Sequence, residues 1–220
     1  VNYVHICVDG QEVLSPDLPI AHGYCRPYNY IELPDEEGLF ELRDVPHGTL
    51  TQEFYKSKIS DNWEKLIVYL PPCVPSAGLP VLYLQHGFGE SEISWSTTGK
   101  VNFLMDKLIA AGKIKPFAIV MGNGMVKQRI DGELKLNRAL YGQMLVEEIL
   151  PMIEKKYQFG GSKEKRGMAG LSMGSVQTTR TICAHPELFS EVGIFSGFLR
   201  DRIVGDEEHD GIVPKSGGQS

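Results

Sequence analysis

A single serine flanked by glycines two residues away on each side constrains this chain more than any other feature of its sequence. The serine is Ser172, in the run Gly170-Leu171-Ser172-Met173-Gly174. This spacing is typical of a sharp turn between a strand and a helix, which lifts the hydroxyl clear of the sheet. A side chain at either glycine would crowd the turn. The motif predicts a serine nucleophile, but a glycine-rich turn that only packs a helix on a sheet has the same spacing.

The sequence around the motif has the order that such a turn requires. Residues 165–169 predict a short buried strand, and residues 172–183 predict a helix that ends before Pro186. Further elements are predicted as an antiparallel pair at 51–58 and 64–70, strands at 81–85, 117–121 and 192–196, and helices at 101–111 and 140–157. We expect Pro151 to kink the last of these helices. Strands that alternate with helices predict an α/β fold on a doubly wound sheet.

The first 47 residues differ from the rest of the chain and predict a short β-rich segment. Strands are expected at 3–8 and 28–33 with a turn at Asp9-Gly10, and residues 34–38 have the composition of a linker. A segment of this length buries too little surface to be stable alone. We therefore expect two parts, a partial module with its linker at 1–47 and the α/β domain at 48–220.

The composition excludes several classes of protein. The chain has 220 residues and a formal net charge of −6, without the basic stripe that suits nucleic acid. No apolar run reaches the roughly 18 residues that a membrane span needs. The four cysteines are far apart and predict neither a zinc site nor a disulfide framework, so no metal or cofactor is expected. The start, Val1-Asn2-Tyr3, has no initiator methionine or leader, which predicts a processed or excised chain and leaves its compartment open.

Acyl transfer through a serine also needs hydrogen-bond donors for the oxyanion that develops on the carbonyl. One donor is expected from the backbone N–H of Met173, which follows the serine at the positive end of the helix. The second is expected from the glycine-rich loop His86-Gly87-Phe88-Gly89, which follows the predicted strand 81–85. We predict that the Phe88 N–H is this donor and that His86 takes no part in proton transfer.

Three segments of the chain, taken together, carry a family resemblance. They are residues 83–95 (YLQHGFGESEISW), 118–124 (AIVMGNG) and 169–174 (AGLSMG). They resemble the esterase D and enterochelin-esterase-like branch of the α/β-hydrolases, and most of all the bacterial feruloyl esterases of xylan-degrading systems. The resemblance covers about residues 45–200. Residues 8–27 resemble the end of the immunoglobulin-like, glycogen-binding-type module that often precedes such esterases.

The resemblance implies a Ser–His–Asp hydrolase that cleaves feruloyl or acetyl esters of plant xylan through an acyl-enzyme on Ser172. Trp95 and Asn123 are expected to bind this polysaccharide or oligosaccharide, since both follow strands at the edge where such sheets hold ligands. Trp95 has an equally good alternative role in packing the core or the rim of the site. A secreted or cell-surface bacterial location follows if the chain is part of a xylan-degrading enzyme.

The acid and the base of such a triad are not evident after Ser172. The candidates are His185, His209, Asp201, Asp206 and Asp210. His185 lies at the far end of the predicted helix, roughly 20 Å from Ser172, and the residues after Phe195 are mostly polar. We therefore predict a hydrolase sheet truncated at its C-terminal side, with an exposed edge that favours a homodimer or strand exchange.

Two other functions remain open from the sequence. A hydrolase-like domain without a working triad could bind carbohydrate or support assembly without catalysis. A protein of the same fold could instead transfer the acyl group to an acceptor other than water.

Overall fold

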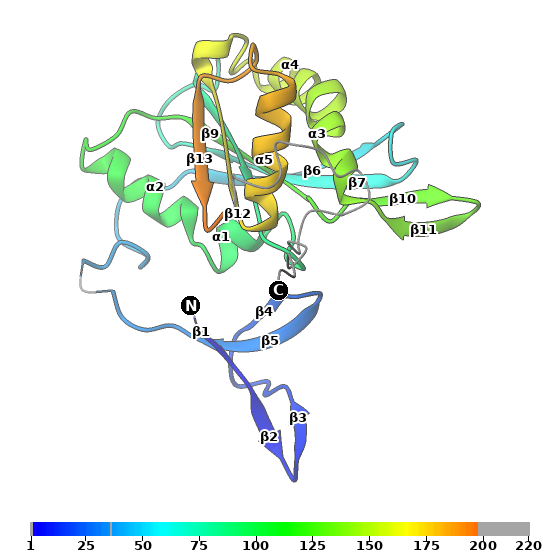
Figure 1. Ribbon diagram of the computed structural model, residues 1–220. Coiled ribbons are helices and arrows are strands. Elements are labelled where there is room, and N and C mark those ends of the chain that lie inside the picture. Colours follow the sequence, from blue (N-terminus) through cyan, green and yellow to red (C-terminus); the bar gives the residue numbers. More distant parts are fainter. Residues whose placement is uncertain (1, 36, 198–220) are drawn as a thin grey trace, which may run out of the picture.

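The computed structural model describes residues 2–35 and 37–197 (Figure 1). The strands are β1 Asn2–Val4, β2 Ile6–Val8, β3 Gln11–Val13, β4 Ile20–Gly23, β5 Arg26–Ile31, β6 Thr49–Lys56, β7 Trp63–Leu70, β8 Val81–Gln85, β9 Ala118–Gly122, β10 Lys127–Ile130, β11 Glu133–Leu136, β12 Arg166–Leu171 and β13 Glu191–Phe195. The helices are α1 Ser94–Thr97, α2 Val101–Ala110, α3 Tyr141–Met144, a π-helical turn Leu145–Ile149, α4 Leu150–Tyr157 and α5 Met173–Ala184, with 3₁₀ turns at Arg138–Leu140 and Lys163–Lys165.

A six-stranded mixed sheet forms the centre of the molecule, in the order β13-β12-β8-β9-β7-β6. β8, β9, β12 and β13 run parallel, whereas β6 and β7 form an antiparallel pair that joins the sheet through β9. Helices α3, α4 and α5 pack on one face and α2 packs on the other. The predicted α/β fold with helices on both faces is therefore confirmed, and the antiparallel pair lies where the sequence predicts it.

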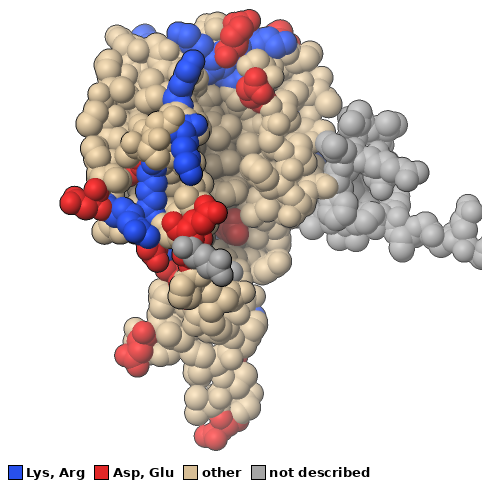
Figure 2. Space-filling model, turned by 90° about the vertical axis from the view of Figure 1, so that its left-hand side faces the viewer, with Lys and Arg blue, Asp and Glu red and all other residues tan. Residues whose placement is uncertain are grey.

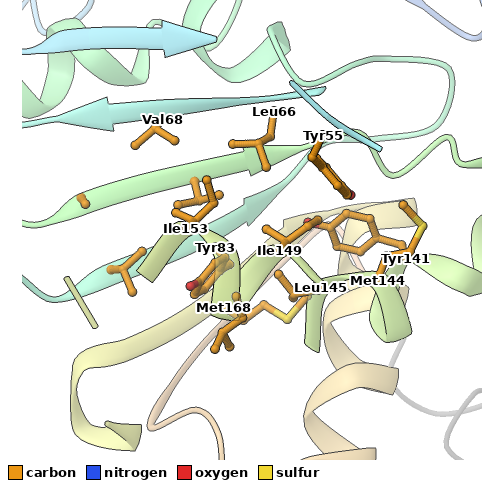
Figure 3. Packing of buried hydrophobic residues seen from close by; sticks show 14 of the residues in the cluster. Tyr55, Leu66, Val68, Tyr83, Tyr141, Met144, Leu145, Ile149, Ile153 and Met168 are labelled. Carbon is orange, nitrogen blue, oxygen red and sulfur yellow. The ribbon is translucent and has the colours of Figure 1, made fainter. Parts of the chain in front are cut away.

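The parallel strands are apolar on both faces because each face has its own core. On β8, Val81 and Tyr83 belong to the cluster beneath α3, α4 and α5, whereas Leu82 and Leu84 belong to the cluster beneath α2. Figure 3 shows the first cluster, where side chains of the sheet meet those of α3 and α4. Burial on both faces places β8 at the centre of the sheet and so fixes the loop at its carboxyl end.

The helix predicted at 140–157 is present but is not uniform. It begins as α3 at Tyr141, widens into the π-helical turn, and continues as α4 to Tyr157. Pro151 lies just after the widened turn, has no N–H to donate, and crowds the carbonyl of Glu147 with its ring. The irregularity therefore lies directly before the proline, where the sequence predicts a kink.

The N-terminal segment differs from the prediction in its pairing. The strand expected at 3–8 is interrupted at His5, so that β1 pairs with β5 and β2 pairs with β3 across the Asp9-Gly10 turn. β1, β5 and β4 form a separate three-stranded sheet. The strand expected at 28–33 begins earlier, because Arg26 pairs with Gly23 of β4. The domain boundary at residue 47 stays a prediction.

Five elements are not predicted from the sequence, namely β3, β4, the short helix α1 and the two strands of the hairpin β10–β11. The hairpin turns at Asp131-Gly132, whose φ values of 53° and 83° suit a two-residue turn with both residues in the left-handed region. The Asp-Gly signal was present in the sequence. The flanking strands escaped notice because their residues are mostly polar and exposed, so no burial pattern marks them.

Two lysines tie the linker after β5 to the central domain. Lys100 pairs with Glu32, and Lys107 of α2 donates to the Gly38 carbonyl. Basic and acidic side chains lie interspersed on this face of the molecule, next to its junction with the narrower N-terminal part (Figure 2). The linker is therefore fastened along the domain rather than extended away from it.

One acidic side chain of the sheet, Glu64 on β7, is only 8% exposed and accepts a 2.8 Å hydrogen bond from Ser60 Oγ. Burial raises the pKa of Glu64 above its ordinary value of 4.5, the bond from Ser60 offsets this in part, and Glu148 and Glu92 add to the rise. The unfolded chain thus releases this proton at a lower pH than the folded chain. Stability from this group is therefore lost as the pH rises through its folded pKa.

We expect Glu64→Gln to increase the free energy of unfolding by about 1 kcal/mol at pH 8 and to leave it unchanged at pH 3. The amide oxygen still accepts the bond from Ser60, but the charge is gone. Urea denaturation of both proteins at the two pH values measures the difference. An equal gain at both pH values would contradict this explanation.

Candidate active site

Ser172 occupies the turn between β12 and α5 and is exposed. Its backbone has φ 52° and ψ −110°, a strained conformation for a residue with a side chain. Hydrogen bonds to both its N–H and its carbonyl hold it there. The Ser172 N–H donates to the Phe195 carbonyl of β13 at 2.9 Å, and the Ser172 carbonyl accepts from Ser175 Oγ at 2.6 Å. The predicted order of strand, turn and helix is present.

Close backbone contacts explain both glycines of the motif. A Cβ on Gly170 would lie 2.2 Å from the carbonyl carbon and oxygen of Gly174. A Cβ on Gly174 would lie 2.7 Å from the carbonyl oxygen of His86. The first turn of α5 therefore packs directly on β12 and on the loop after β8. This packing brings Ser172 and the loop of residues 86–89 together at the carboxyl ends of the parallel strands β12 and β8.

His86 fixes the glycine-rich loop from inside the protein. Its side chain is buried, its Nδ1 bonds to the Gly87 carbonyl at 2.7 Å, and its Nε2 accepts from the Gly124 N–H at 2.9 Å. With Nε2 as an acceptor, Nδ1 carries the proton and the ring is neutral. Burial lowers the pKa of His86, which favours the same neutral form. His86 therefore joins the glycine-rich loop to the loop that follows β9.

The Phe88 N–H is free, although the backbone groups around it are bonded. The Gly87 N–H donates to Glu90 Oε2 at 2.8 Å, and the Gly89 N–H points at the Met125 sulfur at 3.4 Å. No residue in the described part of the chain accepts a hydrogen bond from Phe88 N. The loop thus leaves one N–H available to an outside acceptor.

Met173 provides a second free donor. It is the first residue of α5, and the N–H groups of a first helical turn have no partner within the helix. These groups also carry the positive end of the helix dipole. The ring of Phe88 is held by Arg138, whose guanidinium carbon lies 4.9 Å from the ring centroid. Two backbone donors, the N–H groups of Phe88 and Met173, therefore border the turn that holds Ser172.

Trp95 lies on α1, between the core and open space. Its indole N–H donates to the Gln85 carbonyl at 2.9 Å, and its ring centroid lies 6.2 Å from that of Phe195. It also lines a cavity of about 490 Å³ beside the linker and one of about 270 Å³ that reaches Leu171, next to Ser172. Trp95 therefore packs at the rim, and its part in substrate binding stays a prediction.

Asn123 shapes the loop that follows β9. Its Oδ1 accepts from the Met125 N–H at 2.9 Å, and the next residue, Gly124, donates to His86. The side chain thus has a structural partner close to the glycine-rich loop. A contact between Asn123 and substrate stays a prediction.

Among the candidate triad partners, the one that lies within the described residues is His185, and it is not next to the serine. His185 caps the C-terminal end of α5, about 20 Å from Ser172 at 1.5 Å per residue, and its Nδ1 lies 3.5 Å from Glu187 Oε1. No histidine in residues 2–35 and 37–197 is hydrogen-bonded to the Ser172 hydroxyl. The remaining candidates, His209, Asp201, Asp206 and Asp210, lie outside the described residues.

The sequence analysis missed one histidine–carboxylate pair. Asp106 of α2 is 2% exposed and accepts from His47 Nδ1 at 2.9 Å, the Gly48 N–H at 3.0 Å and the Tyr69 hydroxyl at 2.6 Å. α2 packs on the face of the sheet opposite α5, so this pair of a buried Asp106 and an exposed His47 lies away from the turn that holds Ser172. A separation of 59 residues leaves no local signal for it.

Metal-binding clusters, disulfides and membrane-spanning helices are absent from the described residues. Within the described ranges, no group of three or more His, Cys, Asp or Glu side chains is placed to hold a metal ion. All four cysteines are free and exposed. No helix among these residues combines the length and the apolar character of a membrane span.

An exposed serine in a strained turn, beside a glycine-rich loop with a free N–H and on a sheet of this order, defines an α/β-hydrolase fold. The family model described as "Putative esterase" matches residues 57–210, and the chain belongs to this esterase family.

Individual relatives agree with this assignment. The chain is 36% identical over 205 residues to an endo-1,4-beta-xylanase/feruloyl esterase of Xylanibacter ruminicola, covering 89% of this chain and 28% of that protein. A solved ferulic acid esterase is 30% identical with a TM-score of 0.58, covering 66% of this chain and 59% of the other. The CE1 ferulic acid esterase of Anaeromyces mucronatus in complex with ferulic acid is 21% identical and shares the fold, with a TM-score of 0.67 over 74% and 63% of the chains. The resemblance to feruloyl esterases is confirmed, and the chain spans less than two thirds of each relative.

Proposed function

We propose that this chain is a serine carboxylic ester hydrolase acting on feruloyl or acetyl esters of plant xylan. The observation that carries the proposal is the exposed Ser172 in its strained turn, next to the free backbone N–H groups of Phe88 and Met173. The relatives, which are named as a xylanase/feruloyl esterase and two ferulic acid esterases, support the choice of substrate.

In the proposed reaction, Ser172 Oγ attacks the ester carbonyl and gives up its proton to a general base. The carbonyl becomes a tetrahedral oxyanion, which accepts hydrogen bonds from the N–H groups of Phe88 and Met173. The bond to the sugar oxygen then breaks, the sugar takes the proton, and the acyl group stays on Ser172. Water then attacks the carbonyl of the acyl-enzyme in the same way, which releases the acid and restores the Ser172 hydroxyl. The reaction requires a base, and the described residues hold no histidine that is hydrogen-bonded to the serine.

We assign substrate contacts to Trp95 and Asn123. Trp95 borders the cavity that reaches Leu171, so an acyl group or a sugar ring bound there would lie next to the nucleophile. Asn123 lies in the loop joined to His86 and therefore to the oxyanion loop. An ester-bearing plant polysaccharide or oligosaccharide is the proposed partner.

The proposal is tested by measuring ferulate and acetate released from methyl ferulate, feruloylated arabinoxylan and acetylated xylan. Release of either acid supports an esterase. Retention on an arabinoxylan column without release of acid would favour a non-catalytic binding domain. Formation of an acylated sugar alcohol, when one is added as acceptor, would favour an acyltransferase.

We also propose that the chain associates with itself along β13. β13 pairs with β12 on one side, no other described strand pairs with it, and Val192 and Phe195 are 53% and 48% exposed. An open strand with apolar side chains favours pairing with a second copy. Light scattering is expected to give the mass of a dimer at micromolar concentration. A monomer at every concentration would contradict this proposal.

A further inference from the structure

We infer that the β4–β5 turn of the N-terminal segment, Tyr24-Cys25, is a positioning element of the oxyanion loop. The inference rests on the proposed esterase function, because it concerns the loop that presents the Phe88 N–H. It adds a part of the chain outside the α/β domain to the machinery around Ser172. Figure 1 shows β4 and β5 beyond the end of the sheet to which the arrow of β13 points. The loop of residues 86–89 follows the carboxyl end of β8 and lies at this same end.

Two backbone hydrogen bonds join the turn to the loop. The Tyr24 N–H donates to the Phe88 carbonyl, and the Cys25 N–H donates to the Gly89 carbonyl, both at 3.3 Å. The first of these bonds fixes the peptide unit that follows the Phe88 N–H. The peptide unit that contains this N–H is fixed by His86 through the Gly87 carbonyl. The free donor is therefore held between an inner support, His86, and an outer support, the turn.

The turn is shaped to donate in this direction. Tyr24 and Cys25 have φ values of 50° and 65°, so both lie in the left-handed region. A two-residue hairpin turn needs this conformation, and the N–H groups of its two central residues have no partner inside the turn. The N–H groups of Tyr24 and Cys25 both donate to carbonyl oxygens of the loop. Asn-Gly would adopt this turn with less strain than Tyr-Cys.

Gly89 gives a second and independent observation. It has a φ of 76°, and a Cβ placed on it would lie 2.1 Å from the Cys25 nitrogen and 2.5 Å from the Tyr24 Cα. The contact is with backbone, which cannot swing aside as a long side chain can. Glycine is therefore required at position 89 because the backbone of the N-terminal turn approaches it closely.

A positioning role makes the geometry of the oxyanion site depend on the N-terminal segment. If the turn moves away, the Phe88 and Gly89 carbonyls lose their partners and the loop can rotate about Phe88. His86 alone then holds the peptide unit of the Phe88 N–H, which is free to tilt away from the oxyanion. Loss of one oxyanion donor typically lowers kcat by about 10²–10³-fold. A small ester that is bound mainly at Ser172 should show this loss without a change in KM.

The decisive variant inserts two glycines between Tyr24 and Cys25, which loosens the turn and leaves residues 86–89 unchanged. We expect kcat for p-nitrophenyl acetate to fall by about tenfold or more, with KM within twofold of wild type. The double substitution Tyr24→Asn with Cys25→Gly keeps a two-residue turn with both N–H donors and should retain wild-type kcat. Wild-type kcat in the insertion variant would overturn the inference.

A second pair of variants tests the contact from the side of the loop. Gly89→Ala is expected to lower kcat as the insertion does. Gly132→Ala is its control, because Gly132 has a similar φ of 83° but no atom within 4 Å of an added Cβ. It should leave kcat within twofold of wild type. Equal losses in the two variants would assign the effect to backbone strain and overturn the inference.

Hydrogen exchange separates failure of this inference from failure of the proposed function. Amides of residues 86–90 should exchange faster in the insertion variant than in wild type, whatever the activity. Unchanged exchange would overturn the inference even in an active esterase. Faster exchange in a protein that hydrolyses no ester would retain the contact between turn and loop but reject its role in catalysis together with the proposed function.

Discussion

Ser172→Ala is expected to lower kcat/KM for a feruloyl or acetyl ester by a factor of about 10⁴ or more. Alanine cannot form an acyl-enzyme, so only the oxyanion donors and substrate binding remain. The fold should survive, because Ser172 is exposed and its hydrogen bonds to Phe195 and Ser175 come from backbone atoms of the serine. Initial rates with methyl ferulate and p-nitrophenyl acetate measure the change.

Ser190→Ala is the matched control for this substitution. Ser190 is also exposed, but it precedes β13 and so lies at the amino-terminal end of the parallel strands, whereas Ser172 follows the carboxyl end of β12. The activity of the Ser190→Ala variant should stay within twofold of wild type. A fluorophosphonate probe should attach to Ser172 in wild type and in the control, and mass spectrometry of the labelled peptide locates it. Labelling or hydrolysis that persists in Ser172→Ala would assign the nucleophile to another residue.

The turn around Ser172 could be predicted from the sequence because its determinants are local. Gly170 and Gly174 are two residues from the serine, and a Cβ added to either would lie less than 3 Å from backbone atoms. β8 could also be predicted from local sequence, because a short continuous run of apolar residues is typical of a strand that is buried on both faces of a sheet. The order in which strand, turn and helix follow one another then places the serine at the edge of the sheet.

The supports of the site could not be predicted, because they join residues that are far apart in the chain. The bond between Cys25 and Gly89 connects two loops whose sequences carry no mutual signal. The pair formed by His47 and Asp106 spans 59 residues in the same way. Burial patterns identify which face of an element is covered. They do not identify which backbone N–H will meet which carbonyl, and the geometry of an oxyanion loop depends on such pairs.

Gly170→Ala is expected to lower the free energy of unfolding by about 3 kcal/mol and to slow fluorophosphonate labelling of Ser172 at least tenfold. The new Cβ would lie 2.2 Å from the carbonyl carbon and oxygen of Gly174. These are backbone atoms, so the only relief is to move α5 away from β12. That movement also shifts Ser172 and the Met173 N–H relative to Phe88, which is why reactivity and stability should fall together.

Gly167→Ala separates this contact from the general effect of alanine in β12. Gly167 lies on the same strand, has an ordinary φ like Gly170, and an added Cβ would meet its nearest atoms at 3.4 Å. Its stability should stay within about 0.5 kcal/mol of wild type, with unchanged labelling of Ser172. Urea denaturation and labelling rates of both variants test the pair. If the two variants behave alike, the close contact with Gly174 is not what requires a glycine two residues before the serine.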